Sequence, residues 1–241
     1  MKEYTVENDY AKSLLFGALS EQDRDYLLKQ GQTSHYIKGQ TIFSRGEEGD
    51  WILLIQQGVV EISVVSLNGR KSVLNLMEKD EVLGEIALLD RRERSADAVA
   101  KSDVSGIVLT RHNMIDYLKH NTDACFGVIE TLCSRVRNAS NMFETLALTS
   151  AGARLARCVI RFSEKWGVPD ANGAIRIEHS ISQSDLGEFS GIARENVNRY
   201  MKSWSKDGLL RFNKGEITLL DTCLLYTSDA ADESSSVLRA G

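Results

Sequence analysis

The sequence predicts an α+β protein made of an N-terminal antiparallel β-roll or jelly-roll barrel, a long dimerisation helix and a C-terminal winged helix-turn-helix. Three observations predict this order. Short β-rich runs separated by glycine fill residues 34–110, a helical pattern of apolar residues fills 121–148, and two short helices joined at Ser190-Gly191 precede a hairpin pattern. We expect a roll domain over residues 1–120, the long helix over 121–149 and the winged-helix domain over 150–222.

The roll is predicted from four runs that are rich in β-branched and aromatic residues. These runs are residues 36–43, 51–55, 59–65 and 72–77. The glycines between them mark turns. Short strands at such even spacing are typical of a small antiparallel roll or barrel. A short helix is expected before the roll, over residues 10–29.

The composition excludes several classes of protein. The chain has 241 residues, of which 42% are hydrophobic and 26% charged, and no apolar run approaches the ~20 residues of a membrane span. We therefore expect a soluble, cytoplasmic protein without a membrane partner. Its four cysteines lack the spacing of metal ligands or of a disulfide framework, so we expect no metal site and no tightly bound cofactor. They are Cys125, Cys133, Cys158 and Cys223.

The long helix carries apolar residues at alternating steps of three and four. Such a seam is typical of a helix that packs against a partner helix, and it predicts a dimer interface. The alternative is a helix packed only on its own barrel. The predicted interface residues are Ile129, Leu132, Val136, Ala139, Phe143 and Leu146.

Residues 84–100, GEIALLDRRERSADAVA, combine one acid, one arginine and several small residues. Backbone amides, the guanidinium of Arg94 and the hydroxyl of Ser95 would suit a bound anion. The alternative is a solvated salt bridge between Glu85 and Arg94, which contributes little to stability.

The C-terminal part has the features of a DNA-reading element. Residues 150–222 carry a net charge of +2, although the whole chain carries −5. Ser182 is a plausible N-cap of the first helix, and the outward side of the second helix offers arginines that can pair with guanine and a glutamate that can accept from cytosine. The alternative is a surface ion pair of Glu195 with Arg199. The predicted DNA contacts are Arg194, Glu195, Asn198, Arg199 and Lys202.

Residues 84–100 resemble the phosphate-binding cassette of cyclic-nucleotide-binding domains, and FSRGEEGDWILLIQQGVVEIS resembles the strand-turn-strand pattern of the same family. The order Arg194-Glu195-x-x-x-Arg199, followed by the hairpin KDGLLRFNKGEITLL, resembles the recognition helix and wing of the catabolite-activator and fumarate-nitrate-reduction regulator superfamily of bacterial transcription factors. The resemblance covers residues 34–220.

The resemblance implies a set of ligand contacts. Glu85 would accept from a ribose hydroxyl, and Arg94 and Ser95 would bind a cyclic phosphate. Cyclic AMP is the expected effector, but Ala139-Ser140 stand where cyclic-AMP binders often have Thr-Ser, which leaves cyclic GMP, another metabolite or no effector open. The full expected ligand set is Gly84, Glu85, Ile86, Ala87, Arg94, Ser95, Ala139 and Ser140.

The implied function is a ligand-gated transcription regulator that binds a palindromic operator with TGTGA-like half-sites as a homodimer and contacts RNA polymerase. The alternatives are the same regulator with a different effector or none, and a cyclic-nucleotide regulatory subunit without DNA contact. No catalytic constellation is present in the sequence, so we do not expect an enzyme. Residues 223–241, which begin CLLYTSDAADE, resemble a translated sequencing adapter and are interpreted as a non-native tail.

Overall fold

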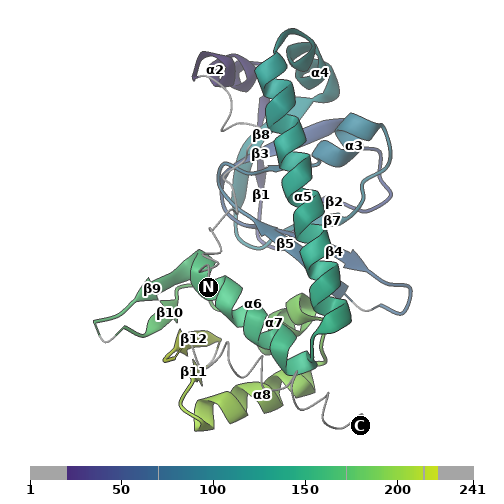
Figure 1. Cartoon of the computed structure of the whole chain (residues 1–241). Coiled ribbons are helices and arrows are strands. Elements are labelled where there is room, and N and C mark those ends of the chain that lie inside the picture. Colours follow the sequence, from purple (N-terminus) through teal and green to yellow (C-terminus); the bar gives the residue numbers. More distant parts are fainter. Residues whose placement is uncertain (1–20, 70, 172, 214, 222–241) are drawn as a thin grey trace, which may run out of the picture. The chain divides into compact units, whose positions relative to one another are not determined.

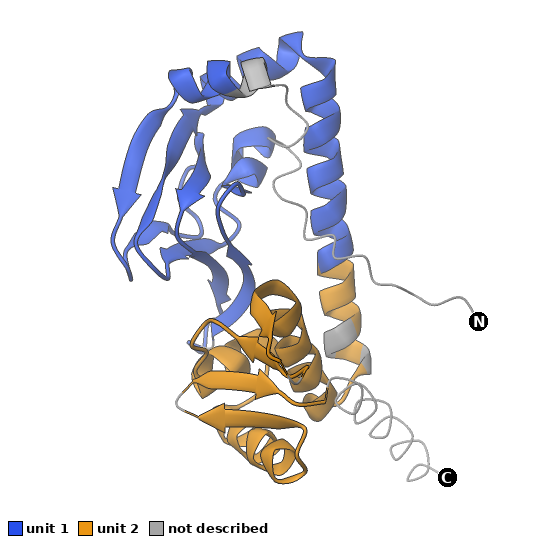
Figure 2. Ribbon diagram, turned by 90° about the vertical axis from the view of Figure 1, so that its left-hand side faces the viewer, with its two compact units in different colours: residues 1–138 blue, residues 139–241 orange. Residues whose placement is uncertain are grey.

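The computed structural model describes residues 21–69, 71–171, 173–213 and 215–221. The chain forms two compact units, Met1–Asn138 and Ala139–Gly241, and the helix α5 (Thr122–Leu148) runs through the boundary between them (Figure 2). The predicted tail over residues 223–241 and the first half of the helix predicted over 10–29 lie outside the described residues. Within the part that is described, no helix combines the length and the apolar character needed to cross a membrane.

The first unit is a roll of two four-stranded sheets (Figure 1). One sheet has the order β1-β8-β3-β6, the other has the order β2-β7-β4-β5, and every strand pair is antiparallel. The predicted α+β roll is therefore confirmed. The strands are β1 (Gln32–Tyr36), β2 (Thr41–Phe43), β3 (Trp51–Gln57), β4 (Val60–Val65), β5 (Lys71–Met77), β6 (Val82–Leu83), β7 (Asp97–Ala100) and β8 (Val104–Thr110).

Two features of the roll differ from the prediction. The run expected as one strand over residues 36–43 is broken by a turn, in which Gly39 adopts a φ of 86° and so takes a conformation that suits glycine. In the described part of this unit there are three helices besides α5, and only the first of them was expected. They are α2 (Glu21–Gln30), α3 (Glu85–Asp90) and α4 (Arg111–His120).

The strand β3 is buried on both of its faces because it lies between two apolar clusters. Ile52 and Leu54 pack in one cluster with Leu27 of α2 and Met114 of α4, so helices cover this side of the sheet. The alternate residues of the strand, such as Leu53, pack in a second cluster with residues of the other sheet. A strand buried on both faces has the continuous apolar run seen in WILLI, and it anchors the loop that precedes it.

The second unit is a winged helix-turn-helix, as predicted. Its small sheet has the order β11-β12-β10-β9, and β11 and β12 form the hairpin wing. Its elements are α6 (Ala151–Trp166), β9 (Gly167–Pro169), β10 (Ile175–Ile177), α7 (Gln183–Ser190), α8 (Arg194–Lys206), β11 (Leu210–Asn213) and β12 (Glu216–Leu219).

A side-chain cap fixes the start of α7, and close packing at two glycines brings the end of α7 against the start of α8. The predicted N-cap is confirmed, because Ser182 Oγ accepts from the Asp185 amide at 3.1 Å and Asp185 Oδ2 accepts from the Ser182 amide at 2.9 Å. At the turn, Gly191 takes a φ of 69°. A Cβ on Gly187 would lie 2.8 Å from the carbonyl oxygen of Ile192, so a glycine is needed where the two helices meet.

The capping box predicts a measurable loss on substitution. Ser182→Ala removes the acceptor for an α7 amide, and we expect the free energy of unfolding to fall by about 1 kcal/mol. Ser184→Ala is the matched control, since Ser184 is an exposed residue in the first turn of the same helix. Urea unfolding followed by circular dichroism would measure both variants, and equal stability of the two would contradict the cap.

Candidate functional site

The junction between β6 and α3 brings the predicted acid and arginine together. Gly84 joins the two elements with a φ of 91°. A Cβ at this position would lie 2.4 Å from Nη1 of Arg94 and 3.1 Å from the carbonyl oxygen of Trp51. Only glycine fits here, because both the backbone conformation and the space exclude a side chain. Glu85 follows as the first residue of α3.

Glu85 is paired with an arginine of the long helix. Its side chain is almost fully buried, with 5% of the residue exposed, and Oε1 lies 2.8 Å from Nε of Arg135. Arg135 also donates from Nη2 to the carbonyl oxygen of Val82 at 3.0 Å. Burial raises the pKa of the Glu85 carboxyl above its ordinary value, and Arg135, and to a smaller extent Arg94, oppose this rise.

Arg94 is enclosed within the roll, with only 3% of the residue exposed. Its Nη1 donates to the Gly84 carbonyl oxygen at 2.9 Å and its Nη2 to the Trp51 carbonyl oxygen at 2.8 Å. The guanidinium carbon lies 4.3 Å from the ring centroid of Phe43 and 4.5 Å from that of Trp51. The buried Nε has no hydrogen-bond partner. A buried cation with an unused donor suits an anionic ligand.

The backbone of Arg94 is fixed by the loop that precedes β3. The Arg94 amide donates to the Glu47 carbonyl oxygen at 2.8 Å, and the Gly46 amide donates to the Arg94 carbonyl oxygen at 2.9 Å. Burial lowers the pKa of the Arg94 guanidinium, and the carboxylates of Asp50, Glu85 and Glu47 oppose this change. Arginine remains protonated in proteins, so the site carries a fixed positive charge.

The remaining predicted ligand residues lie in different environments. Ala87 is buried, whereas Ile86 and Ser95 are exposed. Ala139 and Ser140 are exposed residues of α5 and belong to the second unit. Their contact with a ligand therefore stays a prediction.

Three residues of this site were not predicted from the sequence: Arg135, Phe43 and Trp51. Arg135 could have been found as the basic residue one helical turn before Ala139, on the same side of the long helix. Phe43 and Trp51 border the loop within the stretch FSRGEEGDW that the family resemblance had already marked.

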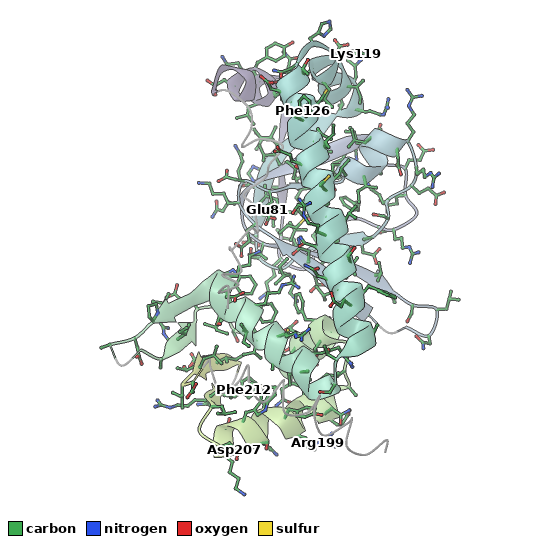
Figure 3. All side chains as sticks on the ribbon, viewed as in Figure 1. Glu81, Lys119, Phe126, Arg199, Asp207 and Phe212 are labelled. Carbon is green, nitrogen blue, oxygen red and sulfur yellow. The ribbon has the colours of Figure 1, made fainter. Side chains whose placement is uncertain are left out.

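The helix α8, which carries Arg199 in Figure 3, has one buried face and one exposed, charged face. Val197, Met201 and Trp204 are buried against the rest of the second unit. The exposed face carries four of the five residues predicted to contact DNA, which are Arg194, Glu195, Arg199 and Lys202. Three cations and one carboxylate on one helix face are suited to phosphates and base edges.

Asn198 contacts α7, and the start of α8 lacks a side-chain cap. Asn198 is half-buried and accepts a hydrogen bond at 3.2 Å from Nε2 of Gln183, so it connects α8 to α7. Its contact with DNA stays a prediction. Ala193 occupies the N-cap of α8 and provides no side-chain cap, so the first amides of this helix lack that acceptor.

The long helix exposes an apolar stripe. Phe126, Ile129, Val136 and Phe143 are exposed, the last of them by 74%. Cys133 is exposed within the same stripe, at alternating steps of four and three. Leu132, also predicted as an interface residue, is half-buried and lines a small apolar cavity in the first unit, and its place in an interface stays a prediction. The side chain of Leu146 lies outside the described residues.

The two units resemble two known protein families. The model for the cyclic nucleotide-binding domain matches residues 33–121, and the model for the Crp-like helix-turn-helix domain matches residues 153–227. The chain belongs to the CRP/FNR superfamily. The regulator has both domains in the order that the family resemblance implied.

Curated relatives and solved structures agree with this assignment. The Cyclic AMP receptor protein of Thermus thermophilus is 27% identical over 213 residues, which cover 88% of this chain and 95% of the relative. The CRP-like cAMP-activated global transcriptional regulator of Mycobacterium tuberculosis is 24% identical over 196 residues, which cover 81% and 87%. The structure of FixK2 from Bradyrhizobium japonicum, 19% identical, shares the fold with a TM-score of 0.72 over 83% of this chain and 97% of that chain.

The relatives are transcriptional regulators and not enzymes. The chain is accordingly a DNA-binding transcription regulator with a cyclic nucleotide-binding domain. The prediction that it is not an enzyme is confirmed by these relatives. The helix-turn-helix match also decides against the alternative of a regulatory subunit without DNA contact.

The ion pair of Glu85 predicts a coupled loss of stability. Arg135→Ala leaves a buried carboxylate without its charged partner, and we expect unfolding to become easier by about 2 kcal/mol. The pKa of Glu85 should rise further, so the variant should lose stability as the pH rises through that pKa. Glu85→Gln should remove this pH dependence. Urea unfolding at several pH values, with the double variant completing a cycle, would measure the coupling, and additive effects would argue against the pair.

Proposed function

We propose that the regulator is a homodimer that binds a cyclic nucleotide in the roll and, in response, a palindromic DNA operator through α8. The observation that carries the proposal is that one acid, Glu85, and one arginine, Arg94, are both buried in the roll, with an unused donor on Arg94 Nε. A cyclic nucleotide offers a match for both charges, because its phosphate is an anion and its ribose hydroxyl is a donor.

The residues present fit such a ligand. Arg94 would supply charge-assisted hydrogen bonds to the cyclic phosphate, and Ser95 would add its hydroxyl. Glu85 would accept from the ribose hydroxyl, and Arg135, whose Nε lies 2.8 Å from Oε1, favours the ionised form of the carboxyl against the effect of burial. Cyclic AMP is the proposed effector, and relatives named as cAMP-activated or as a cyclic AMP receptor support it.

A second candidate keeps DNA binding but uses a different effector or none. Ala139 favours it, because the alanine lacks the hydroxyl that cyclic-AMP binders often have for the base. The names of related proteins also vary in this respect, since one solved relative is described as c-di-GMP responsive and a curated relative is an anaerobic regulatory protein.

The proposed dimer pairs the apolar stripe of α5 with the same stripe of a second copy. Exposed apolar residues at steps of three and four along a helix lose contact with water when two such helices pack in parallel. A two-fold dimer also presents two copies of α8, so that a palindromic site doubles the base contacts of one helix. RNA polymerase is the proposed partner at the promoter.

The proposed operator has TGTGA-like half-sites. Arg194 and Arg199 would donate to guanine, Glu195 would accept from a cytosine amino group, and Lys202 would meet a phosphate. Ligand would favour the DNA-binding arrangement of the dimer only through a higher affinity for that arrangement.

Ligand-dependent DNA binding is the direct test. A mobility-shift assay on a TGTGA palindrome should show that cyclic AMP raises the affinity of the wild type. Arg199→Ala should weaken binding by tenfold or more, in line with a loss of about 1–3 kcal/mol per base contact. Arg94→Ala should bind the palindrome equally with and without cyclic AMP.

Arg176→Ala is the matched control, because Arg176 is an exposed arginine of β10 outside the recognition helix. If the wild type and Arg199→Ala bind the palindrome equally poorly, the proposed DNA target is wrong. A response to cyclic GMP alone, or to neither nucleotide, would favour the second candidate.

The position of Cys133 gives a test of the dimer. In a parallel pair of α5 helices the stripe residues meet their own copies, so mild oxidation should link the two chains through Cys133. The wild type should then run as a covalent dimer in non-reducing electrophoresis, and Cys133→Ser should not. Cys158 is a poor competitor because burial raises the pKa of its thiol to about 12. Cross-linking that persists in Cys133→Ser, or a monomer by light scattering, would contradict this interface.

A further inference from the structure

The surroundings of Arg94 include two aromatic rings that none of the proposed ligand contacts uses. The rings of Phe43 and Trp51 meet edge to face, with centroids 5.7 Å apart and planes at 71°. The guanidinium of Arg94 lies in the corner that they form, and the Trp51 carbonyl oxygen accepts from it. With 3% of Arg94 exposed, a phosphate reaches its donors only after one of these groups has moved.

Of the two rings, Trp51 is the one whose displacement would disturb the core less. Phe43 is a buried member of the second apolar cluster of the roll, and its displacement would open the core. Trp51 is half-buried, packs at the edge of that cluster and is the first residue of β3. An indole has an apolar body and one N–H donor, so it tolerates contact with water better than a phenyl ring does.

One donor of Arg94 lacks an acceptor. Its Nε is buried without a partner, and a Cβ on Gly49 would lie 3.2 Å from it. The cation–π contacts and the two carbonyl acceptors therefore hold the guanidinium without satisfying it completely. An incoming phosphate could supply the missing acceptor and replace the aromatic contact with a full negative charge.

We propose that Trp51 is a gate on the phosphate-binding arginine, covering Arg94 in the unliganded regulator and swinging away when a cyclic nucleotide binds. The inference rests on the proposed function, since it requires an anionic ligand at Arg94. Each binding event has to break the contact between the indole and the guanidinium. The gate thus lowers the affinity of the roll for its effector below that of an open site.

Calorimetry on the full chain with cyclic AMP and with cyclic GMP tests the gate. Trp51→Leu removes the aromatic face, and we expect the nucleotide to bind about tenfold more tightly, which corresponds to the loss of one strong cation–π contact. Trp51→Phe keeps a ring over Arg94 and should remain close to the wild type. Trp166→Leu, the same change on α6 in the second unit, should leave the affinity unchanged.

The outcomes separate the gate from the proposed function. If the wild type binds a nucleotide and Trp51→Leu binds it no more tightly, the gate is overturned while the proposed function stands. If the wild type gives no heat and Trp51→Leu does, the gate is supported. If neither binds either nucleotide, the proposed function fails and the gate fails with it.

Fluorescence provides a second measurement that does not depend on how well Trp51→Leu folds. The chain has three tryptophans, and Trp166→Phe combined with Trp204→Phe leaves only Trp51. Saturating cyclic nucleotide should shift its emission to longer wavelength as the indole enters water. Binding detected by calorimetry without a shift in emission would overturn the gate.

Discussion

The ion pair of Glu85 with Arg135 is the contact on which the proposed switch depends. It joins the first residue of α3 to the long helix, and the side chains are only 7% and 30% exposed. Removing either partner of such a poorly hydrated pair would destabilise the fold, because the remaining charge would be buried without a partner. A ligand that donates to Glu85 alters the charge that Arg135 faces. In the proposed complex, occupancy of the roll would therefore reach α5 through this ion pair.

Glycines make this arrangement of charges possible. At Gly84 and Gly49 a side chain would collide with the atoms around Arg94, so the backbone itself forms part of the wall of the site. The guanidinium is held by carbonyl oxygens and aromatic rings, and not by a carboxylate within bonding distance. An arginine held in this way keeps a positive charge that no carboxylate of the described residues neutralises, so an anion that displaces the covering groups can still pair with it.

Local patterns in the sequence were enough to predict most elements. β-branched runs predicted the strands, a change of period predicted α5, and Ser182 with Asp185 predicted the start of α7. The short helix α3 was missed because six residues give too little periodicity to separate helix from strand. Arg135, Phe43 and Trp51 were missed for another reason. Each meets Glu85 or Arg94 from a distant part of the chain, and their positions near Ala139 and at the ends of FSRGEEGDW do not by themselves indicate that contact.

The long helix shows a similar limit to what the sequence can predict. Spacing predicted one apolar seam that includes Leu132, whereas α5 has apolar residues on two faces, and one face packs on its own roll. Leu132 faces the roll, while its neighbour Cys133 is exposed beside Ile129 and Val136. Which apolar face remains free depends on the packing of the whole unit, so it could be identified only from the structure.

The uncapped start of α8 has a consequence for the order in which recognition occurs. With Ala193 at the N-cap, the first amides of the recognition helix are donors that the protein does not satisfy with a side chain. In the proposed complex a DNA phosphate is the natural acceptor for them. The operator would then act as the last structural element of the regulator, finishing a helix that the protein alone leaves open. Affinity for DNA would include a share of folding free energy that is realised only on the target.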